Sequence, residues 1–268
     1  MTEVLRVGDL AVCYLTRTGP KTVVRDVSFT VDSDTMVGLV GESGSGKSAL
    51  VHAVAGLPRS VTAVVTGSVE LEGEDLLHAS PRAMRRIHGT RIGFVGQNPF
   101  GCLHPILPLH KQFHHVLKAH GKARSRADSR AQAAAALDAV GIQQPERVLA
   151  GYAHELSGGM AQRAVIAMAT VLRPRLLIAD EPTTALDPTV QVQILDLLDS
   201  LRLQQHMAVL VVSHDLGLVA NYCQTALVMK DGRVVEQGAV RDLFENPKHP
   251  YTAELFAEET GGLEGVPA

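Results

Sequence analysis

The sequence has few cysteines, and their spacing excludes the sites that cysteines usually build. Three of the 268 residues are cysteine, at Cys13, Cys102 and Cys223. They are far apart and form no Cys-x-x-Cys pair, so neither a disulfide framework nor a zinc ribbon is indicated. We therefore expect the protein to work in a reducing cytosol.

The sequence also lacks the features of membrane-spanning and nucleic-acid-binding proteins. It contains no run of about 18 consecutive apolar residues, the minimum for a spanning helix, and no signal peptide is visible at its start. The formal net charge is −3, so no global basic field would hold nucleic acid. We expect no nucleic-acid partner, and a chain that works at a membrane only by docking on another subunit.

Short apolar runs predict a mostly parallel sheet covered by helices. Residues 36–40, 176–179 and 208–212 are continuous apolar segments of strand length, and residues 23–31 alternate as a strand would. A glycine-rich turn and a predicted helix over 47–56 follow the first run. Because helical stretches separate the runs, the fold class is α/β.

The pattern changes between Phe100 and Glu155, where strand-like runs disappear. An alanine-rich segment, 131–140, has helical spacing. We expect a helical insertion here, bounded by Asn98-Pro99 and by a Ser-Gly-Gly turn at 157–159. After a predicted hairpin turn at 231–232, a short strand and two short helices should complete the chain.

A glycine-rich loop after the run 36–40 fits the pattern G-x-x-x-x-G-K-[ST]. Its glycines allow several backbone N–H groups to face one point, and the positive end of the following helix adds to them, which suits a polyphosphate. Lys47 should reach the β- and γ-phosphates, and the Ser48 hydroxyl should bind Mg²⁺. A dinucleotide-binding loop is disfavoured because the Lys-Ser pair has no role in that chemistry. The loop residues are Gly41, Glu42, Ser43, Gly44, Ser45, Gly46, Lys47 and Ser48.

Two carboxylates follow the apolar run 176–179 directly. Ligands bind at the carboxyl ends of the strands in a parallel sheet, so both side chains should lie at a binding site. We expect Asp180 to hold Mg²⁺ and Glu181 to act as the general base toward the attacking water. An Asp-Glu pair by itself is usually a solvated loop, and the strand before it and the phosphate loop favour the functional interpretation.

A third motif lies at Leu156-Ser157-Gly158-Gly159-Met160. It resembles the signature motif of ABC (ATP-binding cassette) ATPases. A serine and two glycines before a helix make a second anion site, whereas the chain has one phosphate loop. The resemblance implies two ATP molecules, with Mg²⁺, sandwiched head to tail between this chain and a second ABC ATPase subunit.

The same resemblance assigns further residues. Gln97 matches the glutamine that contacts Mg²⁺ and water, and Asp187 matches the D-loop at the dimer seam. His214 matches the switch histidine that contacts the γ-phosphate and orients the base. Tyr14 lies about where the family has an adenine-stacking aromatic residue, although a tyrosine near an N-terminal strand is more often packing.

The resemblance also implies an architecture, a P-loop NTPase with a RecA-like core, an N-terminal antiparallel β subdomain and an inserted helical subdomain. On this basis we expect the first part of the core at 1–98, the helical subdomain at 99–156 and the second part of the core at 157–236. A short C-terminal extension with a His-Pro-Tyr segment should occupy 237–268.

Finer features resemble the ATPases of oligopeptide, dipeptide and nickel importers. The segments concerned are 152–155 (Tyr-Ala-His-Glu), 182–191 (Pro-Thr-Thr-Ala-Leu-Asp-Pro-Thr-Val-Gln) and 246–252 (Asn-Pro-Lys-His-Pro-Tyr-Thr). Longer members carry a cysteine-rich C-terminal extension. No cysteine follows Cys223 here, so we expect a short member without an iron–sulfur cluster. The segment 100–105 departs from the usual pattern where the membrane partners should bind.

The importer interpretation also implies partner subunits. We expect a second ATPase, non-identical rather than a copy, two transmembrane permease subunits and an extracytoplasmic solute-binding protein, with the chain peripheral on the cytoplasmic face of the membrane. The alternatives are the ATPase of an ABC exporter, a soluble ABC ATPase that is not a transporter, and a nucleotide-gated regulator.

His110 and His114 share a helix face, but two histidines are insufficient for a tight metal site.

Overall fold

The computed structural model describes residues 2–57, 63–184 and 186–260. The chain forms two compact units, the first made of 1–80 and 208–268 and the second of 81–207. Ala185 and the last eight residues of the expected extension 237–268 lie outside the described residues. Within the described part, none of the helices combines the length and apolar character needed to span a bilayer.

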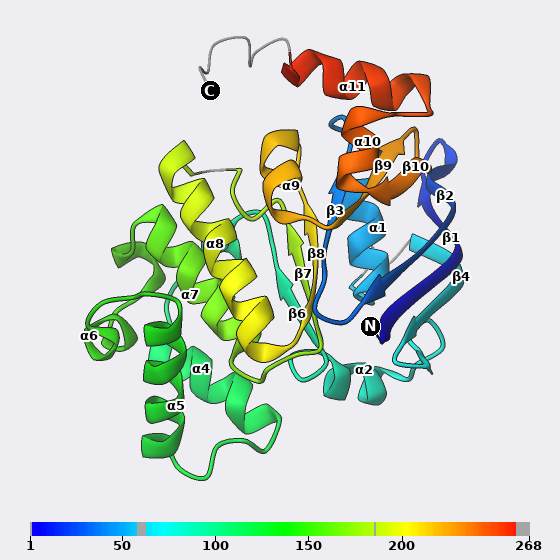
Figure 1. Ribbon diagram of the computed structural model, residues 1–268. Helices are drawn as coiled ribbons and strands as arrows, with labels where there is room; N and C mark the ends of the chain where they lie inside the picture. Colours follow the sequence, from blue (N-terminus) through cyan, green and yellow to red (C-terminus); the bar gives the residue numbers. More distant parts are fainter. Residues whose placement is uncertain (1, 58–62, 185, 261–268) are drawn as a thin grey trace, which may run out of the picture. The chain divides into compact units, whose positions relative to one another are not determined.

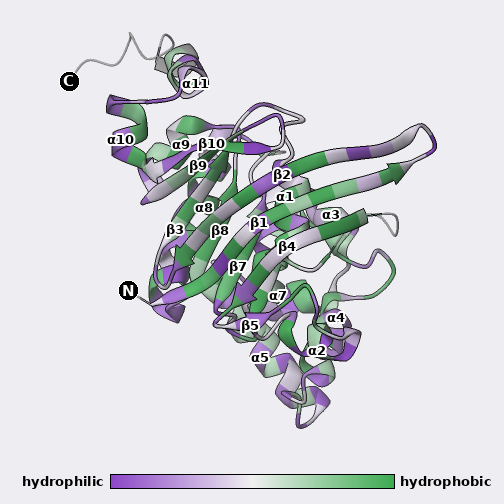
Figure 2. Cartoon of the chain, turned by 90° about the vertical axis from the view of Figure 1, so that its right-hand side faces the viewer, coloured by the Kyte–Doolittle hydropathy of each residue, from purple (hydrophilic) through white to green (hydrophobic). Residues whose placement is uncertain are grey.

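The first unit contains an antiparallel sheet of order β2-β1-β4-β5. Apolar and polar residues alternate along its long strands (Figure 2), and the buried positions pair across β1 and β2, as Leu5 with Val31 and Val7 with Phe29. This is the antiparallel β portion that the family resemblance implied. Its strands are β1 (Glu3–Thr16), β2 (Gly19–Asp32), β4 (Ala63–Leu71) and β5 (Glu74–Asp75).

A second, mixed sheet runs through the same unit in the order β10-β9-β3-β8. The central strand β3 is parallel to both of its neighbours, and every residue of β3 and β8 is buried. This burial explains why both strands read as continuous apolar runs. The predicted hairpin turn is confirmed, since Asp231 and Gly232 have φ values of 49° and 82°. The strands are β3 (Met36–Val40), β8 (Ala208–Val212), β9 (Thr225–Lys230) and β10 (Arg233–Ala239).

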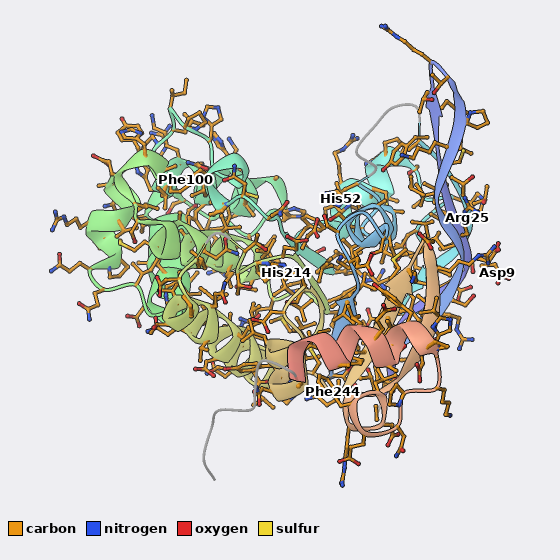
Figure 3. All side chains as sticks on the ribbon, turned by 90° about the horizontal axis from the view of Figure 1, so that it is seen from above. Asp9, Arg25, His52, Phe100, His214 and Phe244 are labelled. Carbon is orange, nitrogen blue, oxygen red and sulfur yellow. The ribbon has the colours of Figure 1, made fainter. Side chains whose placement is uncertain are left out.

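The helices of the first unit are α1 (Lys47–Val54), α9 (Leu216–Tyr222), α10 (Val240–Glu245) and α11 (Pro250–Thr260). The two terminal helices are joined by an aromatic pair, in which the rings of Phe244 and Phe256 have centroids 4.1 Å apart. Phe244 is labelled beside α11 in Figure 3. The start of α11 is fixed by Glu236 of β10, whose carboxylate accepts the backbone N–H groups of Lys248 and His249, each at 2.9 Å.

The second unit is mainly helical, with β6 parallel to β7. Leu109, Phe113 and Leu117 recur at every fourth position of α4 and are fully buried, on a helix that contacts α5 and α6 (Figure 1). The predicted helical segment after Asn98 is therefore confirmed. The elements are α2 (Pro81–Ile87), β6 (Ile92–Val95), α3 (Pro99–Cys102), α4 (Leu109–Ala119), α5 (Arg126–Ala139), α6 (Pro145–Ala150), the 3-10 helix η1 (Ala153–Glu155), α7 (Gly158–Thr170), β7 (Leu176–Asp180) and α8 (Pro188–Gln205).

Two of the three histidines of α4, His110 and His114, have partners within the second unit. The Nδ1 atom of His110 lies 3.0 Å from the carbonyl oxygen of Leu149, and that of His114 lies 2.8 Å from the hydroxyl of Ser129. Both rings therefore join α4 to neighbouring helices, which gives them a structural role that requires no metal.

The anchoring of α11 by Glu236 gives a prediction for stability. Burial opposes ionisation of this carboxyl, but the polar groups around it, among them the N–H groups of Lys248 and His249, outweigh that effect and lower the pKa of Glu236. Glu236→Gln should therefore lower the free energy of unfolding by about 1 kcal/mol at pH 7, as measured by denaturant unfolding. Glu254→Gln, at an exposed position of α11, is the control and should have little effect.

The effect of Glu236→Gln should also depend on pH. A carboxyl whose pKa is lowered by folding stabilises the protein above its unfolded pKa, about 4.3, and this contribution is lost as the pH falls through the folded value. The stabilities of wild type and variant should therefore converge in acid. A difference that persists unchanged below that range would contradict the assigned role of the carboxylate.

Candidate functional site

The phosphate loop leaves the carboxyl end of β3 and is held tightly against neighbouring backbone. Gly41 and Gly46 have φ values of 142° and 106°, which side-chain-bearing residues rarely adopt. A Cβ atom at Gly41 would lie 2.1 Å from the carbonyl oxygen of Met229, and one at Gly46 would lie 2.5 Å from that of Val23. Both glycines are thus required by the fold of the loop as well as by its predicted ligand.

The side chain of Lys47 folds back onto the phosphate loop. Lys47 is the first residue of α1 and is 5% exposed. Its Nζ atom donates to the carbonyl oxygens of Gly41 and Glu42 at 2.6 and 2.8 Å. These two backbone acceptors therefore position the ammonium group at the loop, where a polyphosphate would bind.

Two polar features of the loop fit an anionic ligand. The residue that caps α1 is Gly46, which has no side chain with which to satisfy the first N–H groups of the helix. The hydroxyl of Ser45 is buried and has no hydrogen-bond partner among the described residues. Phosphate oxygens are acceptors that would pair with donors of both kinds.

His214 follows the strand next to β3. The strands β3 and β8 are parallel neighbours, and the N–H group of Ser213 donates to the carbonyl oxygen of Leu39 at 3.2 Å. The first unit therefore brings the phosphate loop and the exposed His214 to the carboxyl ends of adjacent strands.

Tyr14 lies in β1, opposite Lys21 and Ala63, and is half-buried. Its adenine-stacking role stays a prediction.

In the second unit, Gln97 and Glu181 are in direct contact. Asp180 ends β7 and is 1% exposed, and Glu181 follows it with a φ of 50°. The Oε2 atom of Glu181 accepts hydrogen bonds from Nε2 of Gln97 at 2.7 Å and from the hydroxyl of Thr184 at 2.9 Å. The two donors fix the orientation of the carboxylate. Thr184 has no role in the sequence-based prediction, although its position three residues after Glu181 suits this contact.

The signature serine caps the helix that the motif opens. The hydroxyl of Ser157 accepts the N–H group of Met160 at 3.3 Å at the start of α7. A Cβ atom at Gly159 would lie 3.1 Å from Val190 of α8, and one at Gly158 would meet Leu186 at 3.6 Å. The two glycines therefore allow the start of α7 to approach the segment around Asp187.

Asp187 has the equivalent capping role at α8, where its carboxylate accepts the N–H group of Val190 at 3.1 Å. Gln191, one turn into this helix, donates to the carbonyl oxygens of Thr183 and Leu186, each at 3.2 Å. Gln191 thus orders the loop between β7 and α8, a role that no sequence pattern indicated. The second unit brings Gln97 together with Glu181, and the signature glycines together with the loop at Asp187.

Phosphate loop, sheet and helices together define the class of P-loop nucleotide-binding cassettes, and solved structures support this assignment. The chain superposes with a TM-score of 0.78 on the dimeric ATP-binding cassette MJ0796, solved in a post-hydrolysis state with ADP and Pi. The sequence identity is 25%, and the alignment covers 88% of this chain and 99% of that one. The family model described as ABC transporter matches residues 24–184, and the chain belongs to this family.

Within this family, the chain is similar to curated ATP-binding proteins of oligopeptide transport. The chain is 46% identical over 256 residues to the oligopeptide transport ATP-binding protein OppD of Mycobacterium tuberculosis, an alignment covering 96% of this chain and 42% of the relative. It is 41% identical over 273 residues to OppD of Bacillus subtilis, covering 100% of this chain and 76% of the relative. The chain thus spans less than half the length of the mycobacterial protein and three quarters of the other.

The close approach of the loop glycines gives a testable prediction. Gly46→Ala combines a strained φ, which costs about 1–2 kcal/mol, with a forced clash, which costs about 1–3 kcal/mol. We expect a loss of about 2–5 kcal/mol in the free energy of unfolding, measured by denaturant titration. Gly73→Ala is the matched control, because Gly73 also has a positive φ of 80° but nothing lies within 4 Å of an added Cβ. Equal losses in the two variants would show that packing against Val23 and Met229 does not constrain the loop.

Proposed function

We propose that this chain is the ATP-binding and ATP-hydrolysing subunit that energises an ABC importer for peptides. Family membership and the phosphate loop support ATP as the nucleotide that is bound. The names of the relatives support peptides as the transported cargo. The resemblance to nickel importers has no counterpart among those two names, so peptides are the cargo we propose.

The observation that carries the catalytic part is the hydrogen bond between Gln97 and Glu181. Gln97 and Thr184 both donate to Oε2 of Glu181. We propose that the other oxygen, Oε1, accepts the proton of the attacking water. A base held in one orientation loses little entropy when the water binds, which favours proton transfer in the transition state.

The remaining groups hold the triphosphate and its metal. Lys47 and backbone N–H groups of the phosphate loop bind the β- and γ-phosphates, and His214 contacts the γ-phosphate. Oxygen donors suit Mg²⁺, and the residues assigned to hold it, Ser48, Gln97 and Asp180, carry a hydroxyl, a carboxamide and a carboxylate. When bound, Mg²⁺ neutralises charge that develops on the phosphate oxygens.

The signature motif serves the nucleotide of a partner. Ser157, Gly158, Gly159 and Met160 form the start of α7, where helix N–H groups favour an anion. We propose that this end of the helix binds the ATP held by a second, non-identical ATPase subunit. Asp187 would lie at the seam between the two subunits. Hydrolysis at the paired sites would then separate the two subunits.

Coupling to transport requires membrane partners. We propose two permease subunits that bind the inserted helical part, 99–156, and an extracytoplasmic solute-binding protein that delivers the peptide. The chain would then be peripheral on the cytoplasmic face of the membrane. Phe100 and Ile106, exposed by 43% and 77%, offer apolar contact surface in this part of the chain.

Glu181→Gln tests the catalytic assignment. Removing the base should lower ATP turnover by about 10²–10⁴-fold, measured as phosphate release, while ATP is still bound and a nucleotide-bound dimer accumulates. Glu146→Gln is the control in the same unit, because Glu146 forms an exposed ion pair with Arg130 and should leave turnover unchanged. Turnover of the Glu181→Gln variant within a few-fold of wild type would refute the role of this carboxylate.

A further inference from the structure

The C-terminal segment reaches back to the phosphate loop within the first unit. Tyr251, in the first turn of α11, is 3% exposed. Its hydroxyl oxygen accepts the backbone N–H group of Glu42 at 3.1 Å, across 209 positions of the sequence. We call residues 246–251 the C-terminal brace, because they place a buried side chain against the second residue of the loop.

The contact completes the hydrogen bonding of one loop residue. The carbonyl oxygen of Glu42 accepts from Nζ of Lys47 at 2.8 Å and from the N–H group of Ser45 at 3.2 Å. Its own N–H group donates to Tyr251. Both polar backbone groups of Glu42 are therefore paired, and Tyr251 is the partner supplied from outside the loop and its helix.

Several groups fix the position of Tyr251. The Nζ atom of Lys230 lies over its ring, 4.1 Å from the centroid, an attractive cation–π geometry. Nδ1 of His249 accepts the N–H group of Tyr251 at 3.1 Å, and Glu236 holds the N–H group of His249. Burial, reinforced by the nearby Glu42 carboxylate, raises the pKa of Tyr251, so the phenol stays neutral near pH 7.

We infer that Tyr251 is a positioning residue for nucleotide binding, through which the C-terminal brace holds the phosphate loop in its binding conformation. The inference rests on the proposed binding of ATP by this loop and adds a determinant of its affinity. A loop ordered before the ligand arrives does not lose that entropy on binding, so a pre-organised loop binds more tightly. Loss of the brace should therefore weaken binding and raise KM while leaving kcat at saturation nearly unchanged.

Tyr251→Phe tests this inference, because it removes the hydroxyl and keeps the ring under Lys230. We expect the full chain to bind ADP about 3- to 10-fold more weakly, the effect of one lost hydrogen bond, as measured by titration calorimetry. The Glu42 amide should also exchange its hydrogen faster. Phe256→Leu is the matched control in the same helix, since it disturbs the contact with Phe244 and should lower Tm without changing ADP affinity.

The outcomes separate this inference from the proposed function. Wild-type affinity for ADP and unchanged exchange at Glu42 in Tyr251→Phe would overturn the inference and leave the proposed function intact, as would equal losses of affinity in both variants. Failure of the wild-type chain to bind either ADP or ATP would instead refute the proposed function. If Tyr251→Phe does not fold, Glu236→Gln replaces it. By loosening the brace it should weaken ADP binding at least 2-fold, and unaltered affinity would overturn the inference.

Discussion

The close approach of the phosphate loop to the backbone around it is the constraint on which the rest of the first unit depends. The path of the loop leaves no room for a Cβ atom at Gly41, beside Met229, or at Gly46, beside Val23. The loop is therefore fixed by β9 and β2 as well as by β3, which it follows, and α1 begins at a defined point. Lys47, as the first residue of that helix, is placed by the same contacts.

In the second unit, residues that cap helices are also residues to which we assign a role toward nucleotide. Ser157 and Asp187 each accept the backbone N–H group three residues ahead and so fix the starts of α7 and α8. Gln97 and Thr184 hold Glu181, which has a positive φ at the end of a buried strand. In each case a polar side chain with a proposed role toward nucleotide is also ordered by the local fold.

Much of this architecture could be predicted from the sequence, because the signals are local. A buried parallel strand reads as a continuous apolar run, which located β3, β7 and β8, and the phosphate loop has a fixed spacing that located Lys47 and Ser48. The antiparallel sheet was expected through the family resemblance, since its strands alternate without a motif. The run 23–31 indicated part of β2, which in fact extends over Gly19–Asp32.

The contacts that could not be predicted are those between distant positions or those made by common polar residues. Tyr251 belongs to the His-Pro-Tyr segment, but nothing in that pattern indicates that it meets Glu42, 209 positions away. Gln191 and Thr184 lie in a recognised segment, yet their hydrogen bonds depend on the path of the loop between β7 and α8. Such bonds follow from tertiary placement, and a single sequence carries no signal for it.

The central claim is that this chain is one half of an ATPase pair whose turnover is coupled to a transporter. The most direct test measures ATP hydrolysis by the purified chain alone, then with a candidate second ATPase subunit, and then with the permease subunits reconstituted in lipid. The account predicts low turnover for the chain alone and a rise at each addition, because the proposed pairing places the signature motif of one subunit against the nucleotide of the other. Full turnover by the chain alone, unaffected by any partner, would contradict the coupling.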